Sequence, residues 1–114
     1  MEDCIFCKIV SGDMSGEMVY QDDRVTAFKD INPAAPVHIL IVPNRHIASV
    51  RDAEEGDREL LGDLLLTAQT VAEEQGIAAS GYRLIINNGP DAHQEVPHLH
   101  LHVLGGRKMQ HPMG

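Results

Sequence analysis

The chain has 114 residues, with 9 Lys plus Arg against 17 Asp plus Glu and a formal net charge of -8. This length fits a single domain over 1–114, and a hydrophobic content of 43% supplies one packed core, which excludes a disordered chain. The excess of acids excludes a nonspecific grip on nucleic acid and disfavours an anionic membrane surface. No apolar run approaches the ~20 residues of a membrane span, and the N-terminus is not typical of a signal peptide, so we expect a cytoplasmic protein.

Taken in chain order, the sequence alternates short extended segments with one long helix. A short helix is expected over 5–10, and a proline-containing loop over 30–36. Leucine and alanine at three- and four-residue spacing predict the long helix over 53–75. Strands are expected over 18–21, 25–29, 38–42, 83–87 and 98–104. The predicted fold class is α+β: a five-stranded, mainly antiparallel sheet with one long helix and a short N-terminal helix.

The last predicted strand carries His98, His100 and His102 at alternate positions. Because strand side chains alternate, the three imidazoles would share one face, and the apolar residues between them would face the core. At ~3.3 Å per residue, the first and third histidines are ~13 Å apart along the backbone. This distance argues against one metal bound by all three, so we expect the histidines to have different roles.

An imidazole with a pKa near 6.5 is partly neutral at neutral pH, so it can attack phosphorus or act as a general acid or base. The loop that precedes the histidines, over 87–96, is polar and could offer backbone N–H groups to an anion. The sequence therefore indicates phosphate chemistry that needs neither Lys nor Arg, in agreement with the acidic composition.

The histidine segment over 98–104 resembles the signature of the histidine triad superfamily, in which apolar residues separate three histidines. Nearly the whole chain resembles the Hint branch of that superfamily, which includes the purine nucleoside phosphoramidases. The matching blocks are IFCKI (5–9), YQDD (20–23), AFKDINP (27–33), APVH (35–38), VPNRHI (42–47), GYR (81–83) and GGR (105–107). The resemblance implies a single histidine triad domain that forms a homodimer.

The resemblance also implies a nucleotide hydrolase or transferase that cleaves purine nucleoside phosphoramidates through a covalent nucleotidyl-histidine. It makes His100 the expected nucleophile, His102 the phosphate contact, and His98 and His38 their supporting residues. The expected nucleotide-binding residues are Phe6, Phe28, Asp30, Ile31, Asn87, Gln94, Glu95, Val96, His100 and His102. The implied partner is an AMP-like or GMP-like purine nucleotide, and no organic cofactor is implied.

Several alternatives stay open at this point. Phe6, Phe28 and Ile31 also suit plain core packing, and Asp30 also suits a turn cap. Glu95 stands where eukaryotic relatives carry a Ser. A dinucleoside polyphosphate hydrolase, or a nucleotide-binding or interaction module with vestigial hydrolysis, are the alternative functions.

Two cysteines, Cys4 and Cys7, have a spacing that suits one zinc ion but leaves two ligands to be found. The resemblance supplies His46 and His98, so a structural zinc with two sulfur and two nitrogen ligands is expected. The alternative is two free thiols beside a hydrogen-bonded His46. A disulfide is not expected in a cytosolic type of chain.

Overall fold

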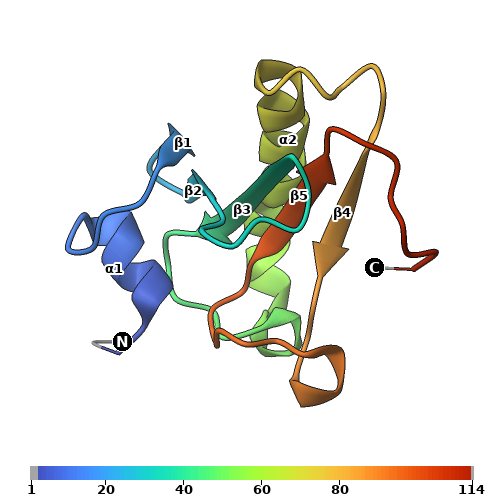
Figure 1. The fold of residues 1–114 in the computed structure, drawn as a ribbon. Coiled ribbons are helices and arrows are strands. Elements are labelled where there is room, and N and C mark those ends of the chain that lie inside the picture. The colour runs from blue at the N-terminus through green and yellow to red at the C-terminus, as the bar shows by residue number, and fades with distance from the viewer. Residues whose placement is uncertain (1–2, 114) are drawn as a thin grey trace.

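In the computed structural model, which describes residues 3–113, five strands form one sheet (Figure 1). They are β1 (Met18–Gln21), β2 (Val25–Lys29), β3 (Val37–Pro43), β4 (Tyr82–Ile86) and β5 (Leu101–Gly105). Their order across the sheet is β1-β2-β3-β5-β4, and every neighbouring pair is antiparallel. This arrangement, with one long and one short helix, confirms the predicted α+β class.

The long helix α2 (Arg58–Glu74) covers one face of the sheet and closes the main core (Figure 1). Leu64 and Val71 of α2 pack there against Ile39 and Ile41 of β3, and none of the four is more than 1% exposed. The residues between the histidines join the same core, as the alternation predicted: Leu99, Leu101 and Val103. In residues 3–113 no helix has the length and apolar character that a membrane crossing requires.

The short helix α1 (Ile5–Ser11) lies on the opposite face of the sheet (Figure 1). Its Phe6 and Ile9 pack in a second buried cluster with Phe28 of β2 and Leu40 of β3. His102 faces the same side, because it lies opposite Leu40 in the β3–β5 ladder. The side of the sheet that carries α1 therefore also carries the histidines.

The predicted start of the long helix at Ala53 was wrong, because α2 begins at Arg58. Two 3-10 turns, η1 (Val50–Asp52) and η2 (Glu55–Asp57), occupy the segment before it. The buried carboxylate of Asp57 accepts a hydrogen bond from the backbone N–H of Glu54 and pairs with Arg45. These contacts hold the backbone of the segment in a capping turn rather than an α-helix.

The predicted strand over 98–104 is also shorter than expected, since β5 begins only at Leu101. Pro43, at the end of β3, has no backbone N–H to extend the ladder. Its carbonyl oxygen instead accepts a hydrogen bond from the side chain of His98, and the Leu99 N–H donates to the Ile47 carbonyl. His98 and His100 consequently lie just outside the sheet, before the first residue of β5. At the sheet edge, β4 spans 82–86 instead of the predicted 83–87.

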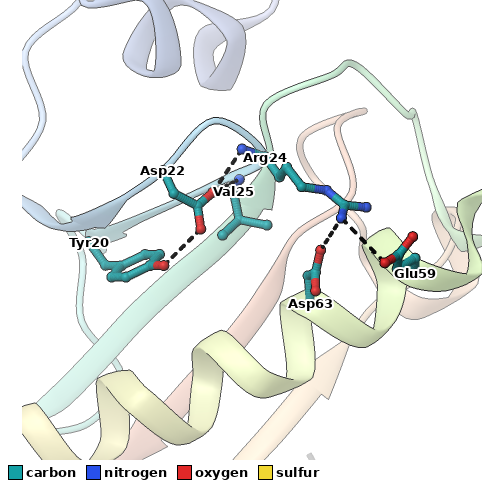
Figure 2. Close-up of polar contacts among 6 residues, drawn as sticks. All are labelled: Tyr20, Asp22, Arg24, Val25, Glu59 and Asp63. Atoms are coloured by element: carbon teal, nitrogen blue, oxygen red, sulfur yellow. Dashed lines mark hydrogen bonds and ion pairs between the residues drawn. The ribbon is translucent and has the colours of Figure 1, made fainter.

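The hairpin of β1 and β2 is tied to α2 by polar contacts (Figure 2). The Asp22 carboxylate accepts hydrogen bonds from the backbone N–H groups of Arg24 and Val25 at 2.7 and 2.8 Å, and from the Tyr20 hydroxyl at 2.7 Å. The Arg24 side chain then reaches Asp63 of α2 at 3.0 Å. These contacts fix the hairpin against the helix at the edge of the sheet far from β4.

Candidate active site

A cavity of about 740 Å³ opens between α1, the sheet and the loop that precedes the histidines. Its apolar wall includes Phe6, Phe28 and Leu40, and its polar end includes His100 and His102. The histidine end therefore adjoins an apolar chamber of the size of a small-molecule site.

The ring of His100 is held in one tautomer by the backbone. Its Nδ1 lies 2.8 Å from the carbonyl oxygen of His98, which can only accept, so Nδ1 carries the proton. Nε2 then carries the lone pair, and within residues 3–113 no protein group hydrogen-bonds to it. The Phe6 ring packs edge-on against the imidazole at a centroid distance of 5.1 Å. His100 therefore presents an oriented nucleophile to the cavity.

His102 is oriented through His38, which lies on β3. The Ala34 N–H donates to Nδ1 of His38 at 3.0 Å, so the neutral His38 ring carries its proton on Nε2. That nitrogen lies 2.9 Å from Nδ1 of His102 and donates to it. The remaining His102 proton is on Nε2, a buried atom with no partner in the described chain. An unpaired buried donor of this kind suits a phosphate oxygen.

Burial keeps this histidine pair neutral. Burial, aided by the neighbouring His100 and His38, lowers the pKa of His102 to about 4. Burial also lowers the pKa of His38, against the opposing effect of the Asp30 carboxylate. Both rings are therefore uncharged at neutral pH, as the two tautomers require.

Asp30 caps a turn and also lines the cavity, so its position is compatible with both roles that the sequence left open. One carboxylate oxygen accepts the Asn32 N–H at 2.8 Å, which caps the turn, and the other lies 3.4 Å from Nε2 of His38. The carboxylate also lines the cavity, where its remaining lone pairs can accept hydroxyl groups. Ile31, next in the chain, lines the cavity mouth and is 88% exposed.

The loop over 87–96 divides its predicted site residues into two groups. Asn87, Glu95 and Val96 line the cavity. Gln94 does not, because its side chain accepts from the Gly89 N–H and donates to the carbonyl oxygens of Ala48 and Val96. Gln94 thus holds the loop in shape through its side chain, and its predicted place beside the phosphate stays a prediction.

Cys4, Cys7, His46 and His98 form a compact cluster behind the triad, with one ligand atom from each within 4.8 Å of the others. The Cys4 sulfur lies 3.2 Å from Nδ1 of His98, and the Cys7 sulfur lies 3.3 Å from Nδ1 of His46. Tetrahedral zinc ligands are ~3.5 Å apart, so these separations fit the metal. His98 donates Nε2–H to the Pro43 carbonyl at 2.9 Å, which leaves its Nδ1 lone pair facing the sulfurs. The four residues can therefore bind a metal ion.

The sequence did not indicate the segment after α1 as part of the site. Met14, Ser15 and Gly16 line the cavity beside Ile9. A side chain added at Gly16 would meet the Ile9 side chain at 3.1 Å, so this glycine lets the segment approach the helix closely. Gly16 is the one feature of the sequence that could have pointed to this segment. A glycine indicates that two backbone segments approach closely, but it does not indicate that they line a cavity.

A nucleophilic imidazole beside an apolar chamber, with a second imidazole that offers a hydrogen bond, defines a site for group transfer at phosphorus. The HIT domain family matches residues 11–109, so the chain belongs to this family, as the histidine pattern predicted.

Named relatives agree with this membership. The purine nucleoside phosphoramidase of Escherichia coli strain K12 is 48% identical over 108 residues, which cover 95% of this chain and 91% of that protein. The crystal structure of a HIT family hydrolase from Legionella pneumophila Philadelphia 1 matches with a TM-score of 0.95 at 45% identity, covering 98% of this chain and 100% of that one. A HIT family hydrolase from Clostridium thermocellum matches with a TM-score of 0.94 at 50% identity, covering 97% and 96%.

Proposed function

We propose that this protein hydrolyses purine nucleoside phosphoramidates through a covalent nucleotidyl-histidine on His100. The observation that carries the proposal is the hydrogen bond from Nδ1 of His100 to the His98 carbonyl, which leaves Nε2 free beside the cavity. The 48% identical relative named a purine nucleoside phosphoramidase supports this choice of reaction.

In the first step, Nε2 of His100 attacks phosphorus and the P–N bond breaks. The amine leaves with the electron pair of that bond and takes a proton from water. In the second step, water attacks the nucleotidyl-histidine, the bond to Nε2 breaks with its electron pair returning to the nitrogen, and the nucleoside monophosphate is released. The proton that the attacking water loses neutralises the hydroxide left by the first step. Nε2–H of His102 donates to a phosphate oxygen in both steps, where charge develops.

The nucleoside would occupy the apolar part of the cavity. Phe6 and Phe28 supply aromatic surfaces that can contact a purine ring, and their rings already pack edge-to-face at 5.4 Å. The Asp30 carboxylate would accept the ribose hydroxyls. Asn87 lines the polar end, near the position proposed for the phosphate.

A structural zinc ion in the cysteine–histidine cluster is part of the proposal. The fit of the four ligand atoms to a tetrahedral ion supports it. When bound, zinc would join α1 to the segment that carries the triad. Burial and the hydrogen bond with Cys4 raise the pKa of Cys7 to about 11, so zinc binding would release a proton from this thiol.

We also propose a homodimer in the cytoplasm. Leu84 and Ile86 on the edge strand β4 are 37% and 39% exposed, and Leu65 and Leu66 on α2 are 53% and 63% exposed. Leu84 and Ile86 lie opposite Val103 and Leu101, so they face the α2 side of the sheet. Exposed apolar side chains on the edge strand and on α2 support a partner surface that includes them. Two cysteines that form no disulfide with each other suit the reducing cytoplasm.

The decisive experiment compares the wild-type protein with His100→Ala. Incubation with an adenosine 5'-phosphoramidate, followed by an alkaline denaturing quench and intact-mass measurement, should show a nucleotidyl adduct on the wild type only. The variant should lose about 10³-fold or more in turnover and still bind AMP. Thr70→Ala, on the exposed face of α2, is the control and should keep full turnover.

Substantial turnover by His100→Ala would overturn the assignment of the nucleophile. A preference of the wild type for diadenosine polyphosphate over the phosphoramidate would replace the proposed reaction with dinucleotide hydrolysis. AMP binding without turnover of either compound would indicate a binding module.

A further inference from the structure

A second cavity of about 460 Å³ lies beside the first, outside the part in which we propose that the nucleoside binds. It is bounded by β4, β5 and the C-terminal segment that follows β5. Asn87, His93 and His102 line both cavities, so these three residues form the boundary between them. A group bound in the second cavity would therefore be next to the phosphate.

The second cavity carries two cationic side chains although the protein is acidic. Arg83 and Arg107 line it, and none of the described lining residues is an Asp or a Glu. In a chain of net charge -8, a wall without carboxylates is unexpected from composition. The local charge therefore favours an anion here, where the molecule as a whole would repel one.

Both arginines keep free donors. Arg83 donates one hydrogen bond to the His111 carbonyl at 2.7 Å, and Arg107 donates one to the Ala34 carbonyl at 3.0 Å. Neither has a carboxylate within 4.0 Å in the part of the chain that the structure describes. A guanidinium has five N–H donors, so most of the donors of each arginine are available to a ligand.

The ladder of β4 and β5 places one of these arginines close to the reacting group. Arg83 lies opposite Leu104, and Ile85, two residues further along β4, lies opposite His102. Arg83 and His102 thus share one face of the sheet as diagonal neighbours, ~7–8 Å apart. That face is opposite to the one on which Leu84 and Ile86 form the proposed partner surface.

The geometry of displacement directs the leaving group toward this cavity. A nucleophile at phosphorus expels the group on its far side, and His100 lines only the first cavity. With the nucleoside in the first cavity, the leaving amine would cross the boundary at His102. The second cavity would then hold the rest of the amine.

We propose that the second cavity binds an amine leaving group that carries a carboxylate, such as an amino acid, and that Arg83 and Arg107 recognise the carboxylate. This inference rests on the proposed phosphoramidase function and specifies its substrate class. The planar fork of a guanidinium matches a carboxylate in two parallel hydrogen bonds, which a neutral amine substituent cannot form.

The test uses two adenosine 5'-phosphoramidates that differ in one group: the nitrogen substituent is an amino acid with a free carboxylate, or the same amino acid as its carboxamide. The wild type should show the higher kcat/KM for the carboxylate. Arg83→Gln and Arg107→Gln should each lower kcat/KM for the carboxylate about tenfold and change it less than twofold for the carboxamide. Arg83→Lys keeps the charge without the fork and should give an intermediate loss.

Arg51→Gln, an exposed arginine outside both cavities, is the matched control and should leave both values unchanged. Equal losses for the two substrates, or no loss for either, would overturn the inference. If the wild type hydrolyses neither compound, the proposed function fails instead. Calorimetric binding of both compounds to His100→Ala then tests the cavity alone, and equal affinities with and without Arg83 would contradict it.

Discussion

At the scale of single residues, the site depends on which ring nitrogen of each histidine carries a proton. The sequence predicted that His98, His100 and His102 have different roles, because their spacing argues against one metal ion bound by all three. It could not predict the tautomers of His98 and His102, since these are set through the backbone carbonyl of Pro43 and the N–H of Ala34, which come from other parts of the chain. Such contacts exist only after the sheet has formed.

The contact from His38 to His102 leads to a prediction for catalysis. His38→Leu removes the donor that holds Nδ1 of His102 as an acceptor, so the unpaired proton on Nε2 is no longer fixed. We expect kcat to fall by about 10² with little change in KM. The reason is that the hydrogen bond from His102 stabilises charge that develops on the phosphate in the transition state, and this stabilisation is lost. Steady-state kinetics with an adenosine phosphoramidate measure both constants.

His38→Gln provides the matched control, since its amide can still donate a hydrogen bond toward His102. This variant should recover part of the lost kcat. Equal kcat values for the leucine and glutamine variants would show that His38 supports the site by packing alone.

At the scale of elements, hydrophobic periodicity predicted the long helix and β-prone runs between turn residues predicted the strands, but two of the boundaries depended on tertiary contacts. Asp57 shortens α2 because its carboxylate pairs with Arg45, which lies outside the predicted helix, just after the strand predicted over 38–42. Pro43 ends the ladder early and leaves His98 outside β5. Both residues were visible in the sequence, but their effects follow from neighbours that only the fold brings close.

The proposed zinc site makes α1 dependent on the metal. Cys7→Ser should reduce the zinc content of protein purified without chelators from about one equivalent to a small fraction, and should lower the unfolding temperature. The reason is that a structural metal contributes its binding free energy to the fold that assembles the ligands. Elemental analysis and thermal unfolding monitored by circular dichroism measure the two effects.

Ser11→Ala, an exposed residue of α1 outside the cluster, serves as the control and should keep the metal. A wild-type protein that contains no metal, and whose unfolding temperature does not respond to added zinc, would favour the alternative of two free thiols beside His46.

At the scale of the whole molecule, the edge strand β4 and the exposed leucines of α2 predict self-association. Ile86→Lys places a charge in the proposed interface and should convert the dimer to a monomer, which light scattering coupled to size-exclusion chromatography would detect. Val50→Lys, an equally exposed apolar position (40%) on η1, should leave the dimer intact. A wild type that is monomeric at tens of micromolar would rule out the interface.

The buried neutral histidines also make the stability of the whole fold depend on pH. The pKa of His102 is lowered to about 4 in the folded protein by burial, whereas an unfolded histidine titrates near 6.5. Between these values the unfolded chain binds more protons, so the free energy of unfolding rises with pH. The contribution is complete above about pH 6.5 and is lost progressively as the pH falls toward 4.

Urea unfolding at several pH values between 4 and 7 would measure this slope. His102→Asn should flatten it, while Gln69→Ala on the exposed face of α2 should leave it unchanged. Release of zinc at low pH affects both proteins alike, because each keeps the four cysteine and histidine ligands, so the difference between their slopes belongs to His102. Parallel curves would mean that His102 is charged in the folded protein, which would contradict the hydrogen bond that it accepts from His38.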